Sequence, residues 1–221
     1  MPSDAPLDYA VRRSARARRV RVRVEPSGQV TVTLPERSRE REAAAAVREL
    51  RPWIDRRLAD VQAARAAIER QPGTVPYLGN SLRLREEASR TRAHRRGGTL
   101  LVPAGPARGD AIERWYRRAA RAEAVPRLDG AASALGAAYT RLSIRDQRTR
   151  WGSCTAGGAI ALNWRLLLGP EEVLDYVVWH EACHLVVMDH SPRFWSLLEM
   201  HVPDYREPRD WLRRNAAALV L

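Results

Sequence analysis

The chain has 221 residues, enough to bury a core in one domain or one and a half, and it carries a formal net charge of +12. Its two cysteines are too few for a disulfide-stabilised fold. Because residues 1–11 lack the features of a signal peptide and the longest apolar stretch, Val173–Met188, is too short and too polar to span a bilayer, we expect a cytoplasmic protein with reduced thiols and no membrane contact.

All 38 basic residues are arginines, against 26 acidic residues. An excess of this size favours anionic partners, so we expect the arginine-rich N-terminal region to bind nucleic acid or another polyanion. A biased genome composition also explains why arginine replaces lysine, although it does not explain the excess over acidic residues. Both explanations stay open at the level of the sequence.

The N-terminal region begins with a polar segment and continues with alternating apolar residues. Residues 1–18 are rich in arginine and have no periodicity, which predicts a flexible basic arm. Valines alternate with arginines over Val20–Val24, and apolar residues alternate again over Val30–Leu34. This pattern predicts a β-hairpin with one buried face.

The next segment changes to helical periodicity and then returns to short strands. From Ser38 to Ile68 the apolar residues recur with helical spacing, and Pro52 interrupts them. We expect two helices, or one kinked helix, with Trp53 packed near the joint. Apolar residues over Tyr77–Leu84 predict a second hairpin, and Thr99–Val102 predicts a further strand.

A dense group of proline and glycine residues at Pro103–Gly109 predicts a boundary between two domains. We expect a lobe of hairpins and helices over residues 19–107 and a second domain over residues 108–221. His94 lies in an arginine-rich loop of the first lobe, where a lone histidine is solvated far more often than it is a ligand.

The second domain is expected to begin with helices and to continue with strands. Asp110 is expected to cap a helix that continues around Pro126 to Leu135. A strand follows at Tyr139–Ile144. The runs Arg150–Cys154 and Ala159–Asn163 are joined by a glycine turn, which predicts a hairpin.

Three further helices are expected toward the C-terminus. Pro170 precedes a helix from Glu171 to about Met188, and this helix is apolar nearly all round, so it should be buried. Ser191 is expected to cap the next helix, with Pro192 in its first turn. A last helix runs from near Glu207 through Leu219.

The buried helix contains the sequence H-E-x-x-H at His180–His184. Residues four apart lie on the same face of a helix, so His180 and His184 can offer two imidazoles to one metal ion. Glu181 is placed to take a proton from a water on that metal. His190 follows just past the helix end and is expected to be the third ligand.

Two alternatives remain for this motif. H-E-x-x-H can occur by chance, and two histidines and a glutamate could instead form a buried hydrogen-bonded network without metal. His201 is an alternative third ligand. The spacing H-E-x-x-H-x5-H is that of the metzincins, but Val187 stands where their glycine belongs, so the chain does not follow the metzincin pattern.

Three imidazoles and a water favour zinc. The zinc would polarise a carbonyl, and Glu181 would deprotonate the water and later protonate the leaving amine. Cys183 points away from the ligand face and is expected to be a small core residue. Cys154 could approach the metal as an inhibitory thiolate, but a structural position is favoured.

Four segments of the chain resemble the YgjP-like, SprT-related zinc metallopeptidases, from Arg150 to Trp211. The resemblance rests on R-W-G-S-C at Arg150–Cys154, I-x-L-N-W-R-L at Ile160–Leu166, D-Y-V-V-x-H-E-x-C-H-L at Asp175–Leu185 and H-S-P-R-F-W at His190–Trp195. It implies an α+β, zincin-like catalytic domain that binds Zn²⁺ through His180, His184 and His190, with Glu181 as the catalytic base.

The resemblance also implies a substrate site. In zincins an edge strand upstream of the active-site helix holds an extended substrate by β-augmentation, and Ala159–Asn163 is the candidate strand. Asn163, Trp164 and Arg165 are then expected to line the cleft. Arg165 and Arg150 could stabilise an oxyanion or could form a structural ion pair with Asp175.

The sequence therefore predicts a zinc metallopeptidase that acts on protein or peptide substrates. A metal-dependent hydrolase of nucleoside triphosphates is one alternative, although the sequence has no glycine-rich phosphate loop and no carboxylate cluster for magnesium. A nucleic-acid-associated protein with a structural zinc is another. It would need a surface where basic and aromatic residues alternate.

Overall fold

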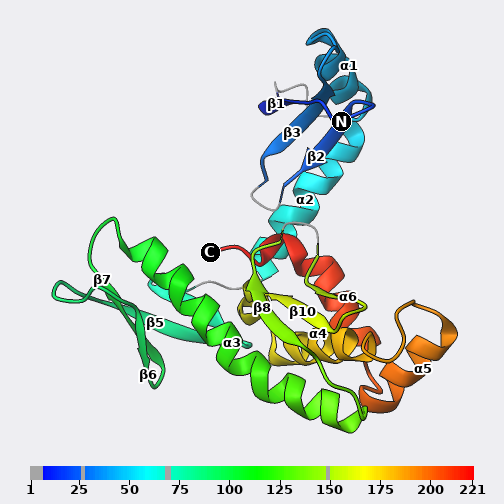
Figure 1. The fold of residues 1–221 in the computed structure, drawn as a ribbon. Coiled ribbons are helices and arrows are strands. Elements are labelled where there is room, and N and C mark those ends of the chain that lie inside the picture. Colours follow the sequence, from blue (N-terminus) through cyan, green and yellow to red (C-terminus); the bar gives the residue numbers. More distant parts are fainter. Residues whose placement is uncertain (1–6, 26–27, 68–70, 148–149) are drawn as a thin grey trace. The chain divides into compact units, whose positions relative to one another are not determined.

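The computed structural model describes residues 7–25, 28–67, 71–147 and 150–221. The fold is mixed α+β, and the chain forms two compact units (Figure 1). Unit 1 contains residues 1–69 and 214–220, and unit 2 contains residues 70–213 and Leu221. Within the described part of the chain, no helix is long and apolar enough to cross a bilayer.

Unit 1 is built on a three-stranded sheet of β1 (Tyr9–Ser14), β2 (Arg21–Val24) and β3 (Val30–Pro35). The central strand β3 pairs antiparallel with β2 and parallel with β1. The predicted hairpin is therefore confirmed in its strands, while residues 26–27 of its turn lie outside the described residues. Alternation buries Val30, Val32 and Leu34 on one face.

Two helices cover the buried face of this sheet. They are α1 (Arg41–Glu49) and α2 (Arg51–Ala67), which separate at Leu50, just before Pro52. The prediction of two helices is confirmed, and Ile68 lies outside the described residues. Trp53 does not pack at the joint as expected, because it is 45% exposed. The short helix η2 (Ala216–Ala218) adds two buried alanines to unit 1 and lies against α2.

The segment expected to be a flexible arm contains the strand β1. Tyr9 and Val11 pair with Val30 and Val32, so their side chains share the apolar face of the sheet. Tyr9 packs against the core of this unit. The apolar residues Leu7, Tyr9 and Val11 thus allow this segment to add an edge strand to the sheet. Residues 1–6 of the expected arm lie outside the described residues.

Unit 2 begins with a four-stranded sheet in the order β4-β5-β7-β6. Its strands are β4 (Thr74–Tyr77), β5 (Asn80–Glu87), β6 (His94–Arg96) and β7 (Thr99–Pro103). The sequence placed these strands in the N-terminal lobe and put the domain boundary after residue 107. In the structure they group with the C-terminal helices, since the second unit begins at Arg70.

The long helix α3 (Arg108–Ala134) lies against strand β7 of this sheet and against the helix α4 (Glu171–Cys183), and Pro126 lies inside it. Trp115 and Tyr116 are buried on α3, and the Tyr116 hydroxyl donates to the Pro76 carbonyl. On the next turns, Arg127 forms ion pairs with Glu123, Glu171 and Asp175. Two of these carboxylates belong to α4, so Arg127 ties α3 to the helix that carries the site.

A second sheet of unit 2 consists of β8 (Arg141–Arg145), β9 (Gly152–Cys154) and β10 (Ala159–Asn163). The predicted hairpin of β9 and β10 is confirmed by antiparallel pairing. β10 also pairs in parallel with β8, so it is the central strand and not an edge. The prediction that Ala159–Asn163 is an edge strand is therefore wrong. The short helix η1 (Trp164–Leu168) follows β10.

The remaining helices of unit 2 are α4 (Glu171–Cys183), α5 (Pro192–His201) and α6 (Arg206–Asn215). Ser191 is the N-cap residue of α5 and Pro192 begins the helix, as predicted. α4 ends five residues earlier than the expected Met188. From Leu185 to Val187 the chain makes tight turns, and Met188 is about half exposed.

Candidate metal centre

The buried helix α4 carries the first part of the site. Glu171 and Glu172 lie in its first turn, where acidic groups interact favourably with the helix dipole. His180 and Glu181 lie in its last turn, and His184 is the C-cap residue. Elements that precede and follow α4 in the sequence pack against it. These are β9 and β10, which come before the helix, and α5, which comes after it.

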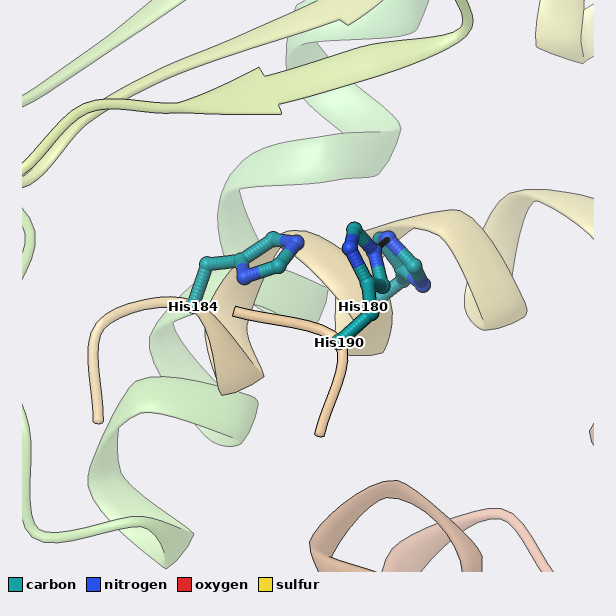
Figure 2. A group of neighbouring side chains, drawn as sticks. All are labelled: His180, His184 and His190. Atoms are coloured by element: carbon teal, nitrogen blue, oxygen red, sulfur yellow. Dashed lines mark hydrogen bonds between the residues drawn. The ribbon is translucent and has the colours of Figure 1, made fainter. Parts of the chain in front are cut away.

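Three histidines meet at this point (Figure 2). Each of His180, His184 and His190 offers one ring nitrogen, and these nitrogens all lie within 4.8 Å of one another. Nε2 of His190 lies 3.0 Å from Nε2 of His180, and the ring of His184 is turned toward this pair. Two nitrogens on one tetrahedral zinc would be about 3.3 Å apart, given Zn–N distances of about 2.0–2.1 Å. Among the described residues, this is the one group with metal-ligand spacing.

The ring of His184 is oriented by the main chain. Its Nδ1 lies 3.0 Å from the carbonyl oxygen of Val187, in the turn that follows α4. A carbonyl only accepts, so Nδ1 carries the proton and donates it. The other nitrogen, Nε2, then keeps its lone pair, which is the form that binds a metal. The short turn after Cys183 thus has a function in the site.

Aromatic packing positions the histidines further. Phe194, on α5, is fully buried and stacks on His184 with ring centroids 4.5 Å apart. The same ring meets His180 and His190 edge-on at 4.9 and 4.8 Å. Nδ1 of His180 is buried and has no hydrogen-bond partner among the described residues, so packing against Phe194 and Tyr176 fixes this ring.

Two of the rings are held in the neutral form. Burial disfavours the imidazolium and, together with repulsion from His184 and His190, lowers the pKa of His180 to about 3. Burial also lowers the pKa of His184. Neutral imidazoles that converge without a carboxylate among them are the donor set of zinc. The residues present therefore fit a zinc ion.

The carboxyl group of Glu181 lies in an unusual environment for a glutamate. Its side chain is only 5% exposed, and burial raises its pKa to about 8, while the positive charge of Arg150 acts in the opposite direction. It packs directly on the backbone of Gly152 in β9. A Cβ added at Gly152 would lie 2.6 Å from Cγ and 2.7 Å from Cδ of Glu181. The glutamate occupies space that any other residue at position 152 would fill.

β9 is an edge strand in the described sheet and lies next to the site. Asn163 donates from its backbone N–H to the Trp151 carbonyl, and Thr155 donates to the Ala159 carbonyl. Hydrogen-bonded pairs alternate in antiparallel strands, so the N–H and C=O groups of Gly152 and Cys154 point away from β10. No described strand pairs with that side of β9.

The three residues expected to contact substrate all contact other residues of the chain. Asn163 is buried; its amide donates to the Gln147 carbonyl, 2.8 Å away, and its oxygen accepts from the Arg165 N–H. Trp164 is fully buried and its ring lies under the Arg165 guanidinium. Arg165 pairs with Asp146 at 2.7 Å and not with Asp175. The contacts of Asn163 and Arg165 fix Asp146 and Gln147 to the end of β10 and the start of η1. Their expected contact with substrate stays a prediction.

The two cysteines, the other two histidines discussed above and Arg150 all lie outside the group of three histidines. Cys154 lies near Glu181, and burial together with that carboxylate raises its pKa to about 11, so it is a neutral thiol outside the histidine group. Cys183 is a buried core residue, as predicted. His201 stacks on Trp179 and is not in the histidine group, while His94 is exposed on β6. Arg150 is exposed and close enough to act on Glu181.

Sequence reasoning missed three contributors to the site, which are Gly152, Phe194 and the main-chain carbonyl of Val187. Of these three, only Gly152 could have been recognised in the sequence, because a glycine within a short strand can mark the close approach of another group. Phe194 resembles any core residue of an amphipathic helix. The Val187 carbonyl depends on where α4 ends, which the continuous apolar run through Met188 conceals.

Comparison with known families gives one match. The family model described as YgjP-like, metallopeptidase domain, matches residues 18–215, which is most of the chain. No curated protein and no solved structure matches it.

Proposed function

Because the chain belongs to the YgjP-like metallopeptidase family, we propose that it is a zinc-dependent peptidase, with His180, His184 and His190 as ligands and Glu181 as general base. The observation that carries this proposal is the convergence of three imidazoles, two of them kept neutral by burial, next to one buried carboxyl group. When bound, zinc would polarise the scissile carbonyl and increase the acidity of a water molecule.

The residues of the chain supply the remaining parts. Glu181 accepts a proton from the attacking water and passes it to the leaving amine, a role that suits a carboxyl group whose pKa lies near neutrality. Gly152 leaves the space for its side chain. Phe194 and the Val187 carbonyl hold the ligand rings in place.

The substrate is proposed to bind along β9. An extended peptide can add to the unpaired edge of a sheet through main-chain hydrogen bonds. The outward N–H and C=O groups of Gly152 and Cys154 offer this pairing next to Glu181. Such contacts read the shape of an extended backbone, which favours unfolded protein segments as substrates.

The main test is the substitution Glu181→Gln. We expect purified protein to contain about one zinc per chain, and the variant to keep this zinc while hydrolysis of an unfolded protein falls by about 10²- to 10⁴-fold. Zinc is measured by elemental analysis and cleavage by mass spectrometry. Glu172→Gln, an exposed glutamate at the start of the same helix, is the matched control and should leave both values unchanged.

The same preparations distinguish the competing functions. Nucleoside triphosphates are assayed beside the unfolded protein with wild type and Glu181→Gln. Triphosphate hydrolysis that disappears in the variant, without any peptide cleavage by wild type, would replace the peptidase by a nucleotide hydrolase. Zinc binding with neither activity would indicate a structural metal. Full peptidase activity after metal removal would contradict the zinc mechanism.

A further inference from the structure

The outer face of the three-stranded sheet in unit 1 carries an ordered group of arginines. The strand register places Arg12 and Arg21 on either side of Thr33, and Arg23 beside Thr31. Residues paired in this way share one face of the sheet, opposite the buried valines of β3. Arg12, Arg21 and Arg23 are all exposed, and we call them the arginine face.

The turn between β1 and β2 extends this charge with the exposed residues Arg16, Arg18 and Arg19. No acidic residue occurs between positions 12 and 23. None of the six arginines forms an ion pair with another residue that the structure describes. Arg12 and Arg21 are two strand spacings apart, about 10 Å, which is within the screening length at about 0.1 M salt. Their mutual repulsion is therefore not fully screened.

Several arginines elsewhere in the chain have identifiable structural functions. Arg13 lies on the other side of β1, and its guanidinium donates to the carbonyls of Glu36 and Ser38. In unit 2, Arg127 joins two helices and Arg165 anchors a loop through Asp146. The arginine face has no such intramolecular function among the described contacts, although it carries a cost from like-charge repulsion.

We propose that the arginine face binds the phosphate backbone of nucleic acid. Guanidinium groups bind phosphate through paired N–H donors, and the hydroxyls of Thr31 and Thr33 between them add further donors. The face has no aromatic residue to stack on bases and no large apolar residue to insert into lipid. Binding is therefore electrostatic and independent of base sequence.

The test measures binding of a fluorescein-labelled DNA duplex of about 30 base pairs by anisotropy, from about 50 to about 200 mM salt. In the variant with Arg12, Arg21 and Arg23 all changed to Gln, we expect affinity to fall at least about tenfold. The slope of log affinity against log salt should become shallower by about 2 to 3, because about 0.9 counterions are released per phosphate contact. A second duplex of different sequence should bind equally well.

The control changes three exposed arginines of unit 2, Arg92, Arg96 and Arg114, to Gln, which removes the same net charge. An equal loss of affinity in this control would overturn the proposal, because net charge alone would then explain binding. A flat salt response would also overturn it, as would binding to phosphatidylglycerol vesicles through these arginines without binding to DNA. Since the substituted side chains are exposed, both variants should keep the wild-type melting temperature.

Discussion

At the scale of single residues, Gly152 is the position on which the carboxyl group of Glu181, the proposed general base, depends most directly. The glycine has no positive φ that would require it for conformational reasons. What requires glycine is the side chain of Glu181, whose Cγ and Cδ lie where a Cβ would be. A methyl group here would push Glu181 away from its position and leave the three histidines untouched.

We expect Gly152→Ala to lower kcat for peptide cleavage by at least about tenfold with zinc content unchanged, and to destabilise the protein by about 1–3 kcal/mol through overpacking. Both effects come from the clash between the added methyl group and the Glu181 side chain. A double-mutant cycle measures the energy of this clash. In a Glu181→Ala background the added methyl group has free space, and Gly152→Ala should then have almost no effect on the free energy of unfolding. Denaturant unfolding of the four proteins measures this directly.

Gly157→Ala is the matched control in the same hairpin, because a Cβ there meets only the Thr155 hydroxyl at 4.0 Å. It should change neither kcat nor the unfolding free energy by a measurable amount. A destabilisation by Gly152→Ala that is equally large with and without the Glu181 side chain would show that the glycine serves only the strand.

At the scale of elements, the helix α3 contains two residues that are poor helix formers. Pro126 and Gly130 both lie inside Arg108–Ala134. A Cβ at Gly130 would meet no atom within 4 Å, and the residue is exposed. The glycine therefore contributes no packing that alanine would disturb.

Gly130→Ala is expected to stabilise the protein by about 0.5–1 kcal/mol, because alanine loses less backbone entropy on folding. The measurement is the midpoint of urea unfolding with a constant m-value. Gly158→Ala provides the contrast. Gly158 has a φ of +72°, and its added Cβ would lie 3.4 Å from the Thr140 nitrogen, so this substitution should destabilise the protein. Equal effects from both substitutions would contradict the argument.

The sequence predicted most elements because their signals are local. Alternation in Val20–Leu34 and the glycine turn before Ala159 correctly indicated hairpins, and Pro192 marked the start of α5. The position of β10 between two strands could not be predicted, because its pairing with β8 joins residues about 18 apart with no local pattern. The end of α4 was missed because the apolar run continues through exposed residues, Val186 and Met188.

In the candidate site, too, the features with a local sequence pattern were predicted and those that depend on distant contacts were not. His180, His184 and His190 were predicted from their spacing, and the structure brings them together. The contacts of Asn163 with Gln147 and of Arg165 with Asp146 were not predictable, since no local pattern joins these positions. The expected contact of both residues with substrate stays a prediction.

At the scale of the whole molecule, the proposed metal ligands belong to one unit and the arginine face to the other. Zinc binding should therefore stabilise the structure around α4 without a direct effect on the sheet of unit 1. A ligand present at about 100 times its dissociation constant adds about 2.7 kcal/mol to the stability of the structure that binds it.

We expect removal of zinc by a chelator to increase hydrogen exchange of the amides in α4 and in the turn that follows Cys183, and to leave exchange in β2 and β3 unchanged. Hydrogen exchange with mass spectrometry gives both regions in one experiment. An equal increase in β2 and β3 would show that the two units open together. Addition of zinc should restore protection in α4.

The two units are interleaved along the chain, and this has a consequence for biosynthesis. Unit 1 takes its last residues, 214–220, from the C-terminal side of unit 2. Ala217 and Ala218 of this segment are buried. During translation, the sheet that carries the arginine face is made first but receives these residues only after the entire metal-site unit has been synthesised. Unit 1 therefore completes its packing only through contacts that span the whole of unit 2 in the sequence, and such non-local contacts carry a larger loop-closure cost during folding.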